Sequence, residues 1–122
     1  MAVLGLDHIN IRTADLGGTR AFFMDVLGLT EGWRPAFPFP GAWLYAGGRD
    51  VVHLVEVRRP GAASEGSALD HFAFTIDDYE GAREALDRHG VAYRPLASPE
   101  GDIRQFFITD LNGVSIELNC RT

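Results

Sequence analysis

Two copies of Leu-Asp-His open two alternating stretches of this chain, LDHINI at 6–11 and LDHFAF at 69–74. The histidines, His8 and His71, lie 63 positions apart, about half of the 122-residue chain. Self-similarity at a fixed period decides the architecture when it is real. If the chain is a repeat, the rest of each half should match as well.

The two halves are predicted to contain the same elements in the same order. Alternation predicts strands, apolar residues three and four apart predict helices, and Gly28 and Gly90 suit helix ends. In the first half we expect a strand over 4–12, a helix capped by Thr13 or Asp15, and strands over 30–34, 42–46 and 51–57. In the second half we expect a strand over 69–76, a helix over 79–89, and strands over 91–94, 103–109 and 114–120.

The length and composition predict one globular domain over residues 1–122, with repeat units 1–58 and 68–122 and a linker over 59–67. No apolar run reaches the roughly 20 residues of a membrane span, and no signal peptide is expected at the N-terminus. The single Cys120 excludes an internal disulfide and fits a cytoplasmic protein. The net charge of −6 argues against binding nucleic acid. Small molecules and protein partners remain.

Four polar residues stand at the centres of predicted strands, and the repeat relates them in pairs: His8 to His71, and His53 to Glu117. A pseudo-twofold pairing of the units would bring them together, and three imidazoles with a carboxylate suit a divalent metal. A lone strand histidine is more often a core or surface group. That explanation would have to apply separately to His8 and to His71, which stand at the same position in the two halves. An unpaired buried carboxylate at Glu117 is costly. His53 is the weakest candidate and fits a supporting or exposed position as well.

Several motifs resemble the vicinal oxygen chelate superfamily, which includes glyoxalase I, bleomycin-binding resistance proteins and extradiol dioxygenases. They are LDHINI, FFMDVLGL at 22–29, LDHFAF, DLNG at 110–113 and IELN at 116–119. The resemblance implies an α+β fold in which two βαβββ repeats form a mostly antiparallel, open barrel-like cup with helices outside. Leu111 departs from the proline usual at that turn.

The resemblance also implies a site. His8, His71 and Glu117 match the commonest ligand positions for a divalent metal, which is Zn, Ni, Mn, Co or Fe. His53 matches the fourth position, where glyoxalase I has glutamate, so Glu117 alone remains as a catalytic carboxylate base. Residues expected to bind substrate share the strand parity of these positions or line the cup: Asn10, Trp43, Thr75, Gln105, Phe107 and Asn119. For Trp43 and Phe107, core packing is an equal alternative.

The function that this resemblance implies is a metal-dependent glyoxalase-like lyase or isomerase acting on a small oxygenated substrate. An iron dioxygenase is an alternative, because two histidines and a carboxylate form its usual triad. A small-molecule-binding resistance protein and a thiol transferase are further alternatives of the same fold. A homodimer is expected, since short members of the family pair their units within or between chains.

Overall fold

The computed structural model describes residues 1–121 and divides into two compact units. Unit 1 spans Met1–Gly61, and unit 2 begins at Ala62. The junction falls inside the segment 59–67 that composition marks as a linker. The later part of that segment belongs to unit 2, because the Ser64 N–H donates to the Gly113 carbonyl (2.9 Å) and the Ser115 N–H donates to Ser64 Oγ (2.7 Å).

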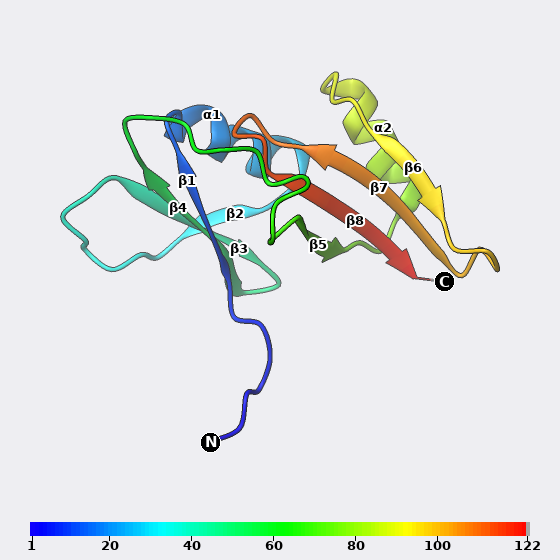
Figure 1. The fold of residues 1–122 in the computed structure, drawn as a ribbon, viewed down its shortest axis with the longest axis horizontal. Helices are drawn as coiled ribbons and strands as arrows, with labels where there is room; N and C mark the ends of the chain where they lie inside the picture. Colours follow the sequence, from blue (N-terminus) through cyan, green and yellow to red (C-terminus); the bar gives the residue numbers. More distant parts are fainter. Residues whose placement is uncertain (122) are drawn as a thin grey trace. The chain divides into compact units, whose positions relative to one another are not determined.

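Unit 1 is a four-stranded sheet with one helical segment (Figure 1). Its elements are β1 (Ile9–Thr13), α1 (Leu16–Ala21), the π-helical turn η1 (Phe22–Val26), β2 (Thr30–Gly32), β3 (Gly41–Ala46) and β4 (Arg49–Glu56). The strand order is β1-β4-β3-β2. The β1–β4 pair is parallel, and the other two pairs are antiparallel.

Unit 2 repeats this plan. Its elements are β5 (His71–Thr75), α2 (Tyr79–Arg88), β6 (Arg94–Ala97), β7 (Ile103–Thr109) and β8 (Ser115–Arg121). The order β5-β8-β7-β6 is the unit 1 order transposed, again with one parallel and two antiparallel pairs. The predicted α+β fold of two βαβββ repeats, mostly antiparallel, is therefore confirmed.

The strand register matches between the units residue by residue. In unit 1, His53 lies opposite Asn10 on one side and Trp43 on the other. In unit 2, Glu117 lies opposite Ala73 and Phe107 in the same way. Residues that face each other across strands project from the same side of a sheet. The repeat seen in the sequence thus extends to the placement of His53 and Glu117.

The helices begin and end alike in both units. Asp15 caps α1 by accepting from the Gly18 N–H (2.9 Å), and Asp78 caps α2 by accepting from the Gly81 N–H (3.0 Å). Each cap carboxylate lies where the third residue of the helix would carry a Cβ, which explains glycine at that position twice. The helical segments end before Gly28 and Gly90, whose positive φ angles of 77° and 66° suit glycine.

Two predicted strands begin three or more residues before their observed starts. The strand expected over 4–12 begins at Ile9, so residues 1–8 lead into β1 as a coil and His8 lies one residue ahead of it (Figure 1). The strand expected over 91–94 is β6, which starts only at Arg94. The reason is the end of α2: the Val91 N–H donates to the Leu86 carbonyl (2.9 Å), which commits Val91 to the helix end.

Each unit has its own apolar core, on one side of its sheet. The completely buried side chains include Phe23, Leu44, Val52 and Leu54 in unit 1, and Leu86, Phe106 and Ile116 in unit 2. In unit 1, α1 lies against β3 and β4. Among residues 1–121 no helix is long and apolar enough to cross a membrane.

Candidate metal and substrate site

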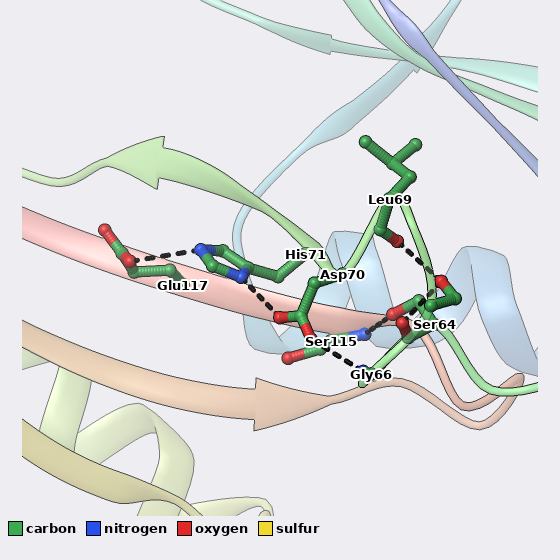
Figure 2. A network of polar contacts seen from close by, with 8 residues as sticks. Ser64, Gly66, Leu69, Asp70, His71, Ser115 and Glu117 are labelled. Atoms are coloured by element: carbon green, nitrogen blue, oxygen red, sulfur yellow. Dashed lines mark hydrogen bonds and ion pairs between the residues drawn. The ribbon is translucent and has the colours of Figure 1, made fainter.

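Unit 2 brings two of the predicted ligands together. His71 is the first residue of β5, and Glu117 lies at the centre of the neighbouring strand β8. The His71 Nε2 atom is 3.5 Å from Glu117 Oε1 (Figure 2). The Glu117 side chain is 11% exposed, whereas His71 is more open at 37%. A buried carboxylate therefore faces the outer nitrogen of an accessible imidazole.

The other nitrogen of His71 is held by its chain neighbour. Asp70 Oδ2 lies 2.7 Å from His71 Nδ1, and Asp70 Oδ1 accepts from the Gly66 N–H at 2.6 Å (Figure 2). The Gly66 N–H and the His71 contact together hold the pKa of Asp70 below its usual value. Asp70 is thus an ionised carboxylate at neutral pH, and it orients His71 from the loop before β5.

Unit 1 places its two predicted ligands in a different arrangement. His8 Nδ1 lies 2.6 Å from Asp7 Oδ2, as His71 lies against Asp70. The His8 ring stacks on His53 with 3.6 Å between ring centroids and 18° between planes. His53 in turn stacks on Trp43 at 3.9 Å and 5°. The three rings form a column, with His53 in the middle.

The His53 imidazole is committed to another carboxylate. Its Nε2 lies 2.6 Å from Asp50 Oδ2, and this hydrogen bond is the main cause that lowers the pKa of Asp50. The lone pair of an imidazole nitrogen lies in the ring plane, so two rings stacked face to face direct their lone pairs in parallel. In this arrangement His8 and His53 do not converge on a single ion. His53 as a metal ligand stays a prediction.

The contact in unit 2 fits two ligands of one small cation. Bonds of about 2.1 Å separated by tetrahedral or right angles place neighbouring donor atoms roughly 3.0–3.4 Å apart. The separation of 3.5 Å between His71 and Glu117 is close to that range. Within residues 1–121, no three or more His, Cys, Asp or Glu side chains gather into a cation-binding group. Each unit thus supplies two of the four predicted positions.

A cavity of about 360 Å³ opens on the His8–His53 face of unit 1. Asn10 and Trp43, both predicted to bind substrate, line it together with His8 and His53. Its other lining residues are Asp7, Arg34, Phe37, Phe39, Asp50, Leu54 and Val55. The Arg34 guanidinium lies over the rings of Phe37 and Phe39, with its carbon 5.2 and 5.1 Å from their centroids. The lining therefore combines aromatic rings with charged and polar side chains.

The predicted substrate residues of unit 2 share the Glu117 face. Asn119 lies opposite Thr75 on one side and Gln105 on the other, one pleat beyond Glu117 and Phe107. The Phe107 ring meets His71 edge-on at 5.4 Å. Within residues 1–121, the buried Asn119 Oδ1 has no hydrogen-bond donor. Because an unpaired buried acceptor is costly, Asn119 is suited to receive a donor from a bound molecule.

Sequence reasoning missed the three carboxylates that hold the histidines: Asp7, Asp50 and Asp70. Two of them were visible, because LDH repeats the aspartate as faithfully as the histidine. Asp50 precedes its histidine by three residues, at the start of β4, where strand alternation gives no sign of the contact.

The fold and the matched polar positions define a class of protein built from two copies of one βαβββ unit. The chain belongs to the Glyoxalase/Bleomycin resistance protein/Dioxygenase superfamily, whose family model matches residues 5–118. The family suspected from the sequence motifs is thereby confirmed.

Similar proteins include an uncharacterized protein, a glutathione transferase and a fosfomycin resistance protein. The uncharacterized protein YaeR of Escherichia coli (strain K12) is 31% identical over 119 residues, covering 91% of this chain and 92% of YaeR. Glutathione transferase FosA of Serratia marcescens is 28% identical over 118 residues, covering 93% of this chain and 79% of FosA. A mutant of the fosfomycin resistance protein FosX of Listeria monocytogenes has the same fold: the TM-score is 0.79 at 19% identity, over 99% of this chain and 95% of FosX. That FosX crystal is a complex with Mn(II) and 1S,2S-dihydroxypropylphosphonic acid.

Proposed function

We propose that this chain is a metal-dependent enzyme of glyoxalase type, a lyase or isomerase acting on a small oxygenated substrate. His71, Glu117 and His8 hold a divalent cation, and His53 takes the fourth position or supports the site. A bound divalent ion supplies an electrophile that polarises a substrate oxygen. Zn, Ni, Mn, Co and Fe all suit imidazole with carboxylate.

The contact between His71 Nε2 and Glu117 Oε1, at 3.5 Å, is the observation that carries this proposal. It brings an imidazole nitrogen and a mostly buried carboxylate together across neighbouring strands. The repeat then places His8 at the matching point of unit 1. The presence of Mn(II) in the FosX crystal supports a divalent cation in a protein of this fold.

Glu117 is the residue to which we assign proton transfer. Its carboxylate has two oxygens, and Oε1 is the one that lies 3.5 Å from His71 Nε2. A carboxylate near a polarised substrate accepts a proton from carbon or oxygen and returns it elsewhere. His53 occupies the matching position in unit 1 and is bonded to Asp50, so it brings no second carboxylate base.

Metal binding tests the proposal directly. Purified protein, first stripped of metal and then titrated with Zn²⁺ or Mn²⁺, should bind one ion for each set of His71, Glu117 and His8. His71→Ala or His8→Ala should remove that binding. His89→Ala is the matched control, because His89 caps the C-terminus of α2 and lies outside the site. If all four proteins bind equally little metal under metal-replete conditions, the proposal is wrong and a metal-free binding protein replaces it.

A substrate panel then separates the reactions. Thiol adducts of methylglyoxal test the glyoxalase reaction, and oxygen uptake with an iron-loaded sample tests a dioxygenase. The similarity to FosA favours one second candidate, a thiol transferase. For that candidate the assay is glutathione consumption with fosfomycin in the presence of Mn²⁺. Turnover there without turnover of the methylglyoxal adducts would replace the isomerase assignment.

We also propose that the protein is a homodimer. The large apolar side chains ahead of β1 are exposed, among them Leu4 at 98% and Leu6 at 79%. Burying such side chains against a second copy removes apolar surface from water. Sedimentation should give twice the mass of the 13.4 kDa chain at micromolar concentration. A monomer in that experiment contradicts the dimer without affecting the metal proposal.

A further inference from the structure

A neutral imidazole carries its proton on one nitrogen and offers the other as a ligand, so a histidine that binds metal must choose between them. An ionised carboxylate only accepts hydrogen bonds, and a ring nitrogen that is hydrogen-bonded to it must therefore carry the proton. The carboxylate partner of each histidine in this chain thus determines which nitrogen is left for a metal.

The same ring nitrogen, Nδ1, is hydrogen-bonded to an aspartate in His71 and in His8. Asp70 Oδ2 lies 2.7 Å from His71 Nδ1, and Asp7 Oδ2 lies 2.6 Å from His8 Nδ1. In both, the carboxylate belongs to the residue just before the histidine, and Nε2 is the nitrogen that is not hydrogen-bonded to it. In unit 2, Nε2 lies 3.5 Å from Glu117 Oε1 (Figure 2).

In His53 the other ring nitrogen, Nε2, is hydrogen-bonded to an aspartate. Its Nε2 contacts Asp50 Oδ2 at 2.6 Å, so in a neutral ring the proton would lie on Nε2 and the lone pair on Nδ1. The described residues therefore hold two kinds of histidine, distinguished by which ring nitrogen is hydrogen-bonded to an aspartate.

We propose that Asp70 and Asp7 are positioning residues that fix the proton on Nδ1 of His71 and His8 and so leave Nε2 to bind the metal. The proposal rests on the metal site proposed above. It also answers why the chain repeats Leu-Asp-His rather than histidine alone. Each copy carries a ligand together with the group that orients it.

Asp70 and Asp7 should hold their histidines with unequal strength. Asp70 is anchored on its far oxygen by the Gly66 N–H at 2.6 Å, and its side chain is 47% exposed. The Asp7 side chain is 79% exposed and lies in the coil ahead of β1. An anchored carboxylate holds its partner more firmly than a solvated one, because less side-chain freedom is lost in each contact. We expect the larger effect from Asp70.

The first test uses metal-free protein and nitrogen-15 NMR of the imidazoles at about pH 8.5, well above the ordinary histidine pKa of about 6.5. His8 and His71 should show the proton on Nδ1, and His53 should show it on Nε2. Asp70→Asn should move His71 toward a mixture of both forms and leave His53 unchanged. Asp50→Asn should do the reverse. A His71 signal that is unchanged in Asp70→Asn overturns the proposal.

The second test titrates Zn²⁺ alone into the same variants and measures affinity calorimetrically. Loss of a group that orients a ligand typically costs about 10- to 100-fold in metal affinity. We expect that loss for Asp70→Asn and a smaller one for Asp7→Asn. Asp77→Asn, which removes an exposed carboxylate from the same unit, should leave affinity unchanged. Asp70→Glu keeps the charge but not the reach, so it should restore affinity only in part.

The outcomes separate the two proposals. If the wild-type protein binds no Zn²⁺ at all, the proposed function fails, and the claim that these aspartates serve metal binding fails with it, whatever the NMR shows. If the wild-type protein binds Zn²⁺ and Asp77→Asn lowers affinity as much as Asp70→Asn, only net charge matters and the positioning role is overturned. Full recovery in Asp70→Glu overturns it in the same way.

Discussion

Unit 1 and unit 2 place a histidine at the same point of the same topology, yet they surround it differently. In unit 2, His71 faces the carboxylate of Glu117 across the strand pair. In unit 1, the residue that matches Glu117 is His53. Its ring stacks against His8, and its Nε2 is hydrogen-bonded to Asp50. The two units thus share the first histidine and its aspartate and differ in the last strand. Only unit 2 carries a carboxylate at the position of His53 and Glu117.

The loops that join the second and third strands differ as well. In unit 1, the connection from β2 to β3 covers residues 33–40 and carries the aromatic wall of the cavity, with Arg34 donating to the Phe39 carbonyl (2.9 Å). In unit 2, the connection from β6 to β7 covers only 98–102 and is closed by a hydrogen bond between Ser98 and Asp102. The longer loop supplies Arg34, Phe37 and Phe39 to the lining of the unit 1 cavity.

The largest expected effect tests whether the two last strands have unequal roles. Glu117→Gln keeps the shape of the side chain but removes its charge and its basicity. We expect turnover to fall about 100- to 10,000-fold, the usual contribution of a general base, together with weaker metal binding. Excess metal should not restore the activity. Turnover assays at saturating metal measure both effects.

His53→Gln is the matched change in unit 1. It should be milder, because three ligands remain and water can fill the fourth position. Equal loss of metal and activity in the two variants would show that the units contribute equally, and our ranking of the ligands would be wrong.

The next effect concerns the core, where the two units carry side chains of different size at matching strand positions. Phe106 of β7 is completely buried and stacks on Tyr79 at 4.2 Å, whereas the repeat-matched residue in β3 is Ala42. Phe106→Ala should lower the free energy of unfolding by about 3–5 kcal/mol, the usual cost of a large cavity. Phe37→Ala, at a side chain 43% exposed, should cost much less. Similar midpoints for the two variants in chemical denaturation would contradict a core in unit 2 centred on Phe106.

Much of this fold was predictable because the repeat reinforces each local signal. The strand over 103–109 was predicted at its observed bounds, and Gly28 and Gly90 show the positive φ expected of glycines at helix ends. The boundaries that failed depend on contacts between distant groups. Val91 follows the helix end, and residues 1–8 find no strand partner within unit 1 despite their alternation.

The candidate site was predictable in its residues but not in its internal contacts. Parity placed Asn10, Trp43 and His53 in one row and Thr75, Gln105 and Asn119 in another, as the strand register has them. Parity cannot say that His53 stacks between two rings or that Asp50 holds its Nε2. Those contacts depend on side-chain rotamers, which the periodicity of a strand does not specify.

A smaller effect tests whether the two helical segments end in the same way. Gly28 and Gly90 both have positive φ, and a Cβ at either position would meet open space. Alanine should therefore cost about 1 kcal/mol at each site, from backbone strain alone. Gly17→Ala within α1, which also meets open space but has an ordinary φ, should instead stabilise by about 0.4–1 kcal/mol. Unequal costs at Gly28 and Gly90 would indicate that the π-helical turn η1 ends differently from α2.

The smallest expected effect follows from the two unequal loops. Ser98 donates to Asp102, and this hydrogen bond is the main cause that lowers the pKa of Asp102 below its ordinary value. A carboxyl group whose pKa is lower in the folded state stabilises the fold above its unfolded pKa of about 3.9, and this contribution is lost as the pH falls through the folded pKa. Ser98→Ala should therefore raise the Asp102 titration midpoint in NMR, and Asp102→Asn should remove this part of the acid dependence of unit 2. The loop 33–40 of unit 1 contains no carboxylate, so Phe39→Ala there should leave acid titration unchanged. An Asp102 midpoint that is the same with and without the Ser98 hydroxyl would show that the short turn is held by its backbone alone.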